Sequence, residues 1–243
     1  MTKPVLWLAS WYPSRIDSFS GDFIERQAIA VSEHMPLTVL AVLKDETLAS
    51  GKVETEITVN GNLTVYRVYY GNAFTIGWIE KLLSLRKYLQ LQKQLFQQIS
   101  AENGQPGLVH VHVAMKAGLL ALFLKKKYRI PFIVTEHWTG YYKQSVPSVF
   151  TSNGLFRNLN KKILQNCSLL IPVSADLGKT INRDFVTVKY QVIPNVVDTA
   201  LFNFQPKHSG RFRFIHPSYL NFQKNPEGIL AACLKKKKKG VDF

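Results

Sequence analysis

A histidine flanked by an acidic and an aromatic residue follows the apolar run Pro-Phe-Ile-Val-Thr. The three residues are Glu136, His137 and Trp138, and Gly140 comes shortly after them. Because the run is apolar and ends abruptly, we predict a buried strand whose last side chains project from its carboxyl end. An imidazole at that position can donate or accept a hydrogen bond near neutral pH. A capped loop with a solvated His137 is the alternative interpretation.

Two further histidines lie in the run Leu-Val-His-Val-His-Val at residues 108–113. Strand alternation places the side chains of His110 and His112 on one face. A histidine pair at this spacing can bind a metal ion, but no Asp, Glu or Cys lies near it in sequence to complete a coordination shell. We therefore predict no metal site and expect core or crevice histidines. His112, the nearer to the strand end, is predicted to line the cleft.

The segment 11–23 connects a first apolar run at residues 5–10 to a helical pattern at 21–33. Gly21 is the first residue of that pattern, and a single glycine where a helix begins is a weak indication of a phosphate-binding turn. Arg15 and Arg26 lie in or beside this segment and can meet an anionic acceptor. Solvated surface arginines are the simpler interpretation of both.

The run 169–202 contains a buried strand ending in Pro-Val-Ser, a helix, and a second strand ending in Ile-Pro-Asn-Val-Val-Asp. Ser174 and Asp176 lie where the N-cap of that helix is expected. In alternating strand–helix sheets, ligands bind at the carboxyl ends of strands, and helix N-termini favour phosphate. We predict that Ser174 and Asn195 line this crevice.

Alternating strand and helix patterns predict the architecture. Strands are expected at 5–10, 37–43, 63–70, 108–113, 132–135 and 168–173, and helices at 21–33, 78–99 and 114–128. The segment 51–61 carries turn residues and little periodicity, so we expect a loop there, and 63–70 is expected to be a third strand or part of a hairpin. The helix at 78–99 is amphipathic; we expect it to pack on the sheet, with membrane docking as the alternative. The alternation predicts a doubly wound, Rossmann-like α/β domain with a mostly parallel sheet.

The pattern begins again after residue 202, with an expected strand at 211–215 and an expected helix at 225–236. One strand and one helix cannot bury each other's apolar faces, because a stable sheet needs about three strands or more. We therefore predict a first domain over 1–200. Residues 201–243 are expected to be the beginning of a second Rossmann-like domain that is truncated.

The chain is strongly basic. Lys and Arg total 31 against 16 Asp and Glu, a net charge of +15, which attracts nucleic acid, anionic lipid or phosphorylated small molecules. No zinc-ligand spacing or RNA-binding aromatic motif supports nucleic-acid binding, and no Gly-x-Gly-x-x-Gly supports a nicotinamide-dependent reductase. Two cysteines fit a reducing compartment. With no secretory signal or apolar run of about 18 residues, we expect a cytoplasmic protein.

Several of these motifs resemble family 4 glycosyltransferases. The strand end Pro-Val-Ser and the segment Ile-Pro-Asn-Val-Val-Asp resemble the hinge between the family's two domains, with Val196 in place of the usual glycine. Thr-Glu-His-Trp is similar to a Thr-x-His-x segment of the family. The series Pro13, Gly21, Phe23 and Gln27 resembles the opening of many members.

The resemblance implies a GT-B fold and a retaining glycosyltransferase that needs no metal ion. Its donor would be a nucleotide sugar such as a UDP- or GDP-sugar, and its acceptor a glycan or a lipid-linked molecule. His137 would contact the reacting sugar and the acceptor, with Glu136, Trp138, His112 and Arg15 on the acceptor side. Peripheral contact with an anionic membrane, at the inner face of the cell membrane, is the further expectation.

The donor diphosphate would be met by a second group of residues, namely Gly21, Ser174, Asn195 and Lys224. Lys224 matches the lysine of an Arg-x-x-x-x-Lys motif, whose arginine is replaced here by Tyr219. The family's two-glutamate motif belongs to a part of the second domain beyond residue 243. The alternative hypothesis is therefore a non-catalytic fragment that keeps only acceptor or partner binding.

Overall fold

The computed structural model describes residues 3–71, 77–204, 214–218, 220 and 224–238. The chain divides into two compact units, Met1–Val197 and Asp198–Phe243. None of the helices in the described part of the chain combines the length and the hydropathy needed to cross a bilayer.

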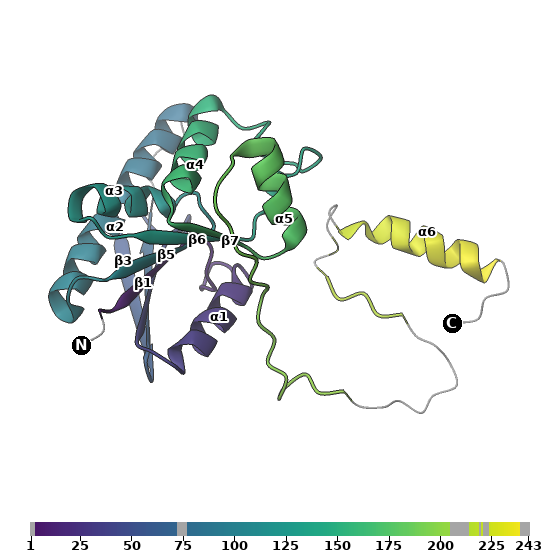
Figure 1. Ribbon diagram of the computed structural model, residues 1–243, viewed down its shortest axis with the longest axis horizontal. Helices are drawn as coiled ribbons and strands as arrows, with labels where there is room; N and C mark the ends of the chain where they lie inside the picture. Colours follow the sequence, from purple (N-terminus) through teal and green to yellow (C-terminus); the bar gives the residue numbers. More distant parts are fainter. Residues whose placement is uncertain (1–2, 72–76, 205–213, 219, 221–223, 239–243) are drawn as a thin grey trace. The chain divides into compact units, whose positions relative to one another are not determined.

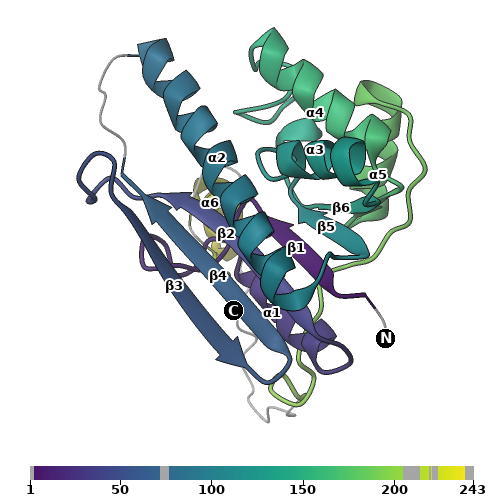
Figure 2. The same ribbon diagram turned by 90° about the vertical axis from the view of Figure 1, so that its left-hand side faces the viewer.

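A seven-stranded sheet, in the order β3-β4-β2-β1-β5-β6-β7, forms the centre of the first unit (Figures 1 and 2). The strands are β1 (Val5–Ala9), β2 (Leu37–Lys44), β3 (Val53–Asn60), β4 (Leu63–Tyr70), β5 (Leu108–His112), β6 (Phe132–Glu136) and β7 (Leu169–Pro172). All neighbouring strands run parallel except β3 and β4. The predicted doubly wound α/β fold is confirmed.

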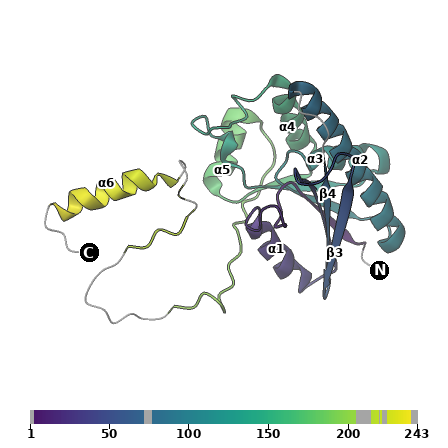
Figure 3. The same cartoon turned by 180° about the vertical axis from the view of Figure 1, so that it is seen from behind.

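Helices cover both faces of this sheet (Figures 1 and 3). They are α1 (Asp22–Ser32), α2 (Gly77–Asn103), α3 (Gly118–Tyr128), α4 (Gly154–Asn166), α5 (Ala175–Thr180), the 3-10 turn η1 (Thr139–Tyr141) and the π-helical turn η2 (Ile181–Phe185). α1 packs on one face, and α2, α3 and α4 on the other. Because both faces are covered, the central strands are mostly apolar on both of their faces.

Alternation along β1 shows how the two cores are divided. Leu6 and Leu8 point into the larger core beneath α2 and α3, whereas Trp7 and Ala9 point into the smaller core beneath α1. All four side chains are buried. This division fixes which strand residues reach the α1 side of the sheet near the site.

The prediction of a loop over 51–61 was wrong, because this segment contains β3. The strand pairs with β4 through a two-residue turn at Gly61, whose φ of 55° is in the region that favours glycine. Every residue of β3 is exposed. With no buried face to impose alternation of apolar and polar residues, its signal was limited to the β-branched residues Val, Thr and Ile.

The strand predicted before the Ile-Pro-Asn-Val-Val-Asp motif is reduced to a single bridge between Leu170 and Tyr190. The chain still runs alongside β7, since the backbone N–H of Gln191 donates to Leu170 and that of Ile193 donates to Pro172. This arrangement places the motif beside the last strand of the sheet.

The second unit contains the predicted helix as α6 (Pro226–Lys237), capped by the side chain of Asn225. No residue of α6 is buried. Residues 211–213 of the predicted strand lie outside the described residues, and Phe214 and Ile215 are not in a strand. Its assignment as the opening of a donor domain stays a prediction.

Candidate functional site

Four loops meet at the carboxyl edge of the sheet, because the strands that precede them, β1, β5, β6 and β7, are neighbours. The chain winds outward from β1 in both directions, with β2 on one side and β5 on the other. In open α/β sheets, this switch point is where ligands bind. The candidate site is therefore built on the residues that follow these four strands.

Ser10 joins the loops after β1 and β5. Its hydroxyl donates to the carbonyl oxygen of Val113 at 2.8 Å and accepts from the backbone N–H of Ala117 at 3.1 Å, directly before α3. Its own N–H donates to the carbonyl of His112. This one side chain therefore links the loop after β1 to the loop after β5. Sequence analysis missed Ser10, although its place immediately after the first buried strand was a usable signal.

Glu136 is fully buried at the end of β6 and accepts four hydrogen bonds. One carboxylate oxygen accepts from the backbone N–H groups of His137 and Trp138, both at 3.0 Å. The other accepts from the N–H of Ala114 at 3.1 Å and the hydroxyl of Tyr141 at 3.0 Å. The carboxylate therefore binds the loop after β5 to the loop after β6.

Burial raises the pKa of Glu136, and the four donated hydrogen bonds oppose that rise by favouring the carboxylate. The hydroxyl of Tyr141 also lies 2.9 Å from the side-chain oxygen of Asn160, which extends the network into α4. Contact with an acceptor would require Glu136 to leave its donors. The geometry therefore favours a positioning role for this residue. Tyr141 and Asn160 are further members of the site that sequence analysis did not find.

His137 is half-buried directly beyond this network. Its ring lies against that of Phe23 from α1, with centroids 4.4 Å apart. Neither ring nitrogen has a hydrogen-bond partner within the described part of the protein. Burial lowers the pKa of His137 to about 4, so the imidazole is neutral at physiological pH. A neutral ring has one N–H donor and one acceptor nitrogen; both are buried here and neither is used within the described residues.

The other two predicted histidines continue the row of rings. His112 is fully buried, 4.2 Å from the ring of His110 and 4.0 Å from that of Trp7. His110 contacts the hydroxyl of Thr135 at 2.6 Å. Burial lowers the pKa of His110 to about 3 and that of His112 well below its usual value. Within the described residues, no group of three or more His, Cys, Asp or Glu side chains is placed to hold a metal ion.

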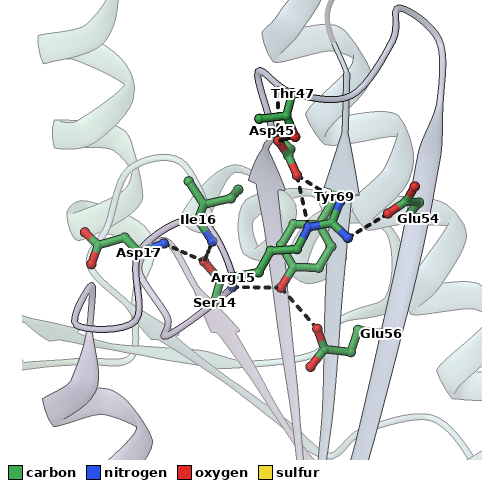
Figure 4. A network of polar contacts seen from close by, with 9 residues as sticks. All are labelled: Ser14, Arg15, Ile16, Asp17, Asp45, Thr47, Glu54, Glu56 and Tyr69. Atoms are coloured by element: carbon green, nitrogen blue, oxygen red, sulfur yellow. Dashed lines mark hydrogen bonds and ion pairs between the residues drawn. The ribbon is translucent and has the colours of Figure 1, made fainter.

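Arg15 connects the loop after β1 to Asp45, which directly follows β2, and to Glu54, which lies near the start of β3 (Figure 4). Its guanidinium donates to Asp45 at 2.8 Å and to Glu54 at 2.7 Å, and it lies 4.1 Å from the ring centroid of Tyr69. Hydrogen bonds from Thr47 and then from Arg15 lower the pKa of Asp45. Because its charge is already matched by two carboxylates, Arg15 would have to give up these partners to bind an acceptor.

Gly21 is the N-cap of α1, with a φ of 73°. A Cβ atom at this position would lie 2.7 Å from the backbone of Trp11. Both the conformation and the close approach therefore require glycine. Gly21 thus opens α1 beside Phe23, whose ring lies against that of His137. Phosphate binding at this turn stays a prediction.

Ser174 and Asn195 are both engaged by the chain itself. The hydroxyl of Ser174 accepts from the N–H of Leu177 as the N-cap of α5, as the sequence predicted. The side chain of Asn195 accepts from Gln27 of α1 at 3.0 Å. This contact links the Ile-Pro-Asn-Val-Val-Asp segment to α1, beside an apolar cavity of about 190 Å³ that His110 also lines.

The two remaining predictions concern Trp138 and Lys224. The half-buried ring of Trp138 packs edge-on against Tyr141 and Phe156. Lys224 belongs to the second unit, directly before the cap of α6. Tyr219, at the place of the family's arginine, lies outside the described residues. The diphosphate role of Lys224 stays a prediction.

Solved structures that are similar to this chain include glycosyltransferases of the GT-B type. Sucrose-phosphate synthase from Thermosynechococcus elongatus superposes with a TM-score of 0.57 at 14% identity, covering 84% of this chain and 53% of that one. A UDP-forming α,α-trehalose-phosphate synthase from Burkholderia xenovorans gives 0.51 at 12% identity, covering 80% and 48%. The chain thus spans about half the length of these proteins, and at such low identity the likeness shows the fold alone.

The family follows from the sequence match. The family model described as Glycosyltransferase Family 4 matches residues 49–201, which is more than half of the chain. The chain therefore belongs to glycosyltransferase family 4, and the resemblance read from its motifs is confirmed. A comparison with curated protein sequences gave no significant match.

Proposed function

We propose that this chain forms the acceptor-side part of a retaining glycosyltransferase, which moves a sugar from a UDP- or GDP-sugar to a glycan or lipid-linked acceptor in the cytoplasm. Family membership supports the transferase class. The observation that carries the proposal is His137, whose two ring nitrogens have no partner in the described part of the chain and lie at the switch point of the sheet. Such an arrangement is suited to binding the hydroxyl groups of a sugar.

The chemistry replaces one bond at the anomeric carbon by another. The bond to the donor diphosphate breaks as the bond to an acceptor hydroxyl oxygen forms on the same face of the sugar, and the proton of that hydroxyl passes to the departing diphosphate. His137 acts as a neutral hydrogen-bonding group, because its pKa of about 4 excludes the imidazolium near pH 7. Side chains around His137 have to move before a sugar can reach it, since both ring nitrogens are buried in this conformation. Glu136 holds the backbone of His137 in place.

The donor side of the proposal uses the predicted residues Gly21, Ser174, Asn195 and Lys224. A leaving diphosphate gains negative charge, which a fixed cation such as Lys224 would stabilise. On the family resemblance we propose that no resident metal ion takes part. Transfer is then expected to continue unchanged in the presence of EDTA.

The test is transfer of radiolabelled sugar from UDP- and GDP-sugars to polysaccharide and lipid extracts. We expect His137→Ala to reduce transfer at least 100-fold, with the urea-unfolding midpoint close to that of the wild type. His34→Ala changes an exposed histidine of the same chain and should retain full activity. The same measurements on a version extended with a complete second domain separate two outcomes. Acceptor binding without turnover by this chain supports the fragment hypothesis, and no nucleotide-sugar binding by either version contradicts the proposal.

A further inference from the structure

The apolar cavity on the α1 side of the sheet has no part in the sugar transfer proposed above. Its volume is about 190 Å³. One wall consists of side chains from four neighbouring strands, Trp7 of β1, His110 of β5, Thr135 of β6 and Ile171 of β7. Those of Trp7, Thr135 and Ile171 are buried. His137 is not among the described residues that line the cavity.

Two further segments of the first unit complete the cavity. Ala30 and Val31 belong to α1, and Ile193, Pro194 and Val196 belong to the segment after β7. No Lys, Arg, Asp or Glu is among the described residues of the lining. A charged ligand would lose its hydration there without gaining a partner. The cavity therefore favours a neutral and mostly apolar occupant.

His110 supplies a polar group within this apolar lining. Its Nε2 lies 2.6 Å from the hydroxyl of Thr135, a contact that orients the ring. Within the described residues, the other ring nitrogen, Nδ1, has no hydrogen-bond partner. Because burial lowers the pKa of His110 to about 3, the ring is neutral, and Nδ1 is a donor or an acceptor according to the tautomer. A hydroxyl group on the ligand would complement either form, since it both donates and accepts.

The rings in the lining favour an aromatic occupant. Trp7 and His110 lie with their centroids 4.9 Å apart and their planes at 69° to each other. A third ring placed parallel to one of them meets the other nearly edge-on. Offset stacking and edge-to-face contact are the two arrangements that aromatic pairs prefer. A saturated ring of the same size gains neither.

The size and the cover of the cavity limit what can enter it. Apolar cavities of about 150 Å³ stay dry and can take up a molecule of the size of benzene. In the covering segment, Ile193 is 46% and Val196 is 40% exposed. Between them, Asn195 accepts a hydrogen bond from Gln27, which also lines the cavity. A small ligand can therefore enter by displacing this segment while the buried strands stay in place.

We propose that this cavity binds a small neutral phenol, that is, one aromatic ring that carries a hydroxyl group. The ring contacts Trp7 and Ile171, and the hydroxyl forms a hydrogen bond with Nδ1 of His110. The ligand is a whole small molecule, because a volume of about 190 Å³ leaves no room for a glycan attached to the ring. The site is additional to the proposed transfer and does not depend on it.

The experiment is a proton–nitrogen correlation NMR titration of the full chain with phenol, toluene and cyclohexanol. Trp7 lines the cavity, so its indole N–H signal, assigned by its absence from Trp7→Phe, should shift and saturate with phenol. The signal of Trp138, which packs against Tyr141 and Phe156, should not move. Cyclohexanol should bind about fivefold more weakly than phenol, because it lacks the aromatic contacts.

Two variants test the lining. His110→Phe keeps a ring but removes Nδ1, so it should weaken phenol binding about 10-fold and toluene binding less than threefold. Ala30→Leu fills the cavity from α1 and should abolish the Trp7 shift with all three compounds. The matched control is Ala101→Leu, the same change at an exposed position of α2, which should bind phenol as the wild type does. Far-ultraviolet circular dichroism checks that each variant is folded.

Several outcomes would overturn the proposal. One is a Trp7 signal that does not respond to phenol, and another is phenol binding by folded Ala30→Leu equal to that of the wild type. Equal weakening of phenol and toluene by His110→Phe would contradict the hydrogen bond. Binding of para-hydroxyphenyl glucoside as tight as that of phenol would contradict a whole-molecule ligand. The assay uses no nucleotide sugar, so its outcome is independent of the tests on His137.

Discussion

Two networks fix the loops of the site by opposite means. The carboxylate of Glu136 is buried and accepts hydrogen bonds from three backbone N–H groups and one hydroxyl. Arg15, in the loop after β1, forms an exposed ion pair with Glu54 and a second one with Asp45, whose side chain is 4% exposed (Figure 4). The side chain of Arg15 is 43% exposed and that of Glu54 is 46% exposed.

This difference predicts that the two networks hold their loops with different rigidity. Buried donors left without an acceptor are costly, so the loop of His137 is held firmly by Glu136. Exposed ion pairs are screened by water and salt and contribute little. The part of the loop after β1 that Arg15 holds is therefore the more easily moved.

The largest effect is expected from Glu136→Ala. This substitution leaves the N–H groups of Ala114, His137 and Trp138 and the hydroxyl of Tyr141 without their common acceptor in a buried place. We expect the free energy of unfolding in urea to fall by about 3–5 kcal/mol. Glu54→Ala, which removes an exposed carboxylate from the other network, is the matched control. A loss below about 1 kcal/mol for Glu136→Ala would remove the distinction between the networks.

As the pH falls, the stability contributed by the buried neutral histidines should be lost before the stability contributed by the network of Arg15. The unfolded chain protonates its histidines near pH 6.5, but the folded chain protonates His137 only near pH 4 and His110 near pH 3. Stability is therefore lost as the pH falls below about 6.5, by about 2 kcal/mol per histidine between pH 7 and pH 5. Asp45 acts later, because its lowered pKa gives stability that is lost only below its ordinary titration range.

Urea unfolding at pH 7, 6 and 5 measures this dependence. His137→Gln should lose less stability over this interval than the wild type, since one of the protonation sites is gone. His34→Gln, at an exposed position, should keep the wild-type slope. Equal slopes for the wild type and His137→Gln would show that burial does not keep this imidazole neutral.

A smaller loss is expected from Tyr141→Phe, which removes one of the four donors to Glu136 and the contact with Asn160. A hydrogen bond to a buried carboxylate is worth about 1.5–3 kcal/mol, and the remaining three donors still satisfy Glu136. We expect the free energy of unfolding in urea to fall by about 1.5 kcal/mol. A loss as large as that of Glu136→Ala would mean that Tyr141, and not the carboxylate, organises the loop.

The smallest effect is expected for the exposed ion pair of Arg15 and Glu54. A double-mutant cycle of Arg15→Ala and Glu54→Ala should give a coupling energy below that of every change above. The coupling should vanish in molar salt, because solvent-exposed charges are screened. A coupling that persists at high salt would place Arg15 with the buried network instead.

The burial of Glu136 could have been predicted from the sequence. Phe132, Val134 and Glu136 alternate along one strand, so the same face that carries two core residues also carries the carboxylate. A buried Glu was therefore implied by the register of β6. Its donors were not, because Ala114 and Tyr141 reach it through loop conformations that no periodic pattern describes.

The second network was hidden for a different reason. Arg15 was recognised as a candidate, but its partners Asp45 and Glu54 lie at the end of β2 and in the strand that was expected to be a loop. Pairing between distant segments depends on strand order, which a single sequence does not specify. The parallel sheet itself was predictable, since its buried strands are short apolar runs separated by helical patterns.

The edges of the sheet differ in whether another strand can be added. Beside β7, the chain's own backbone occupies the outer side, with the N–H of Leu170 donating to Lys189. β3 has no neighbour on its outer side within the described part of the sheet, and Ile57 and Val59 are 49% and 69% exposed there. Among these described strands, a strand added by a foreign polypeptide would therefore pair with β3 and not with β7.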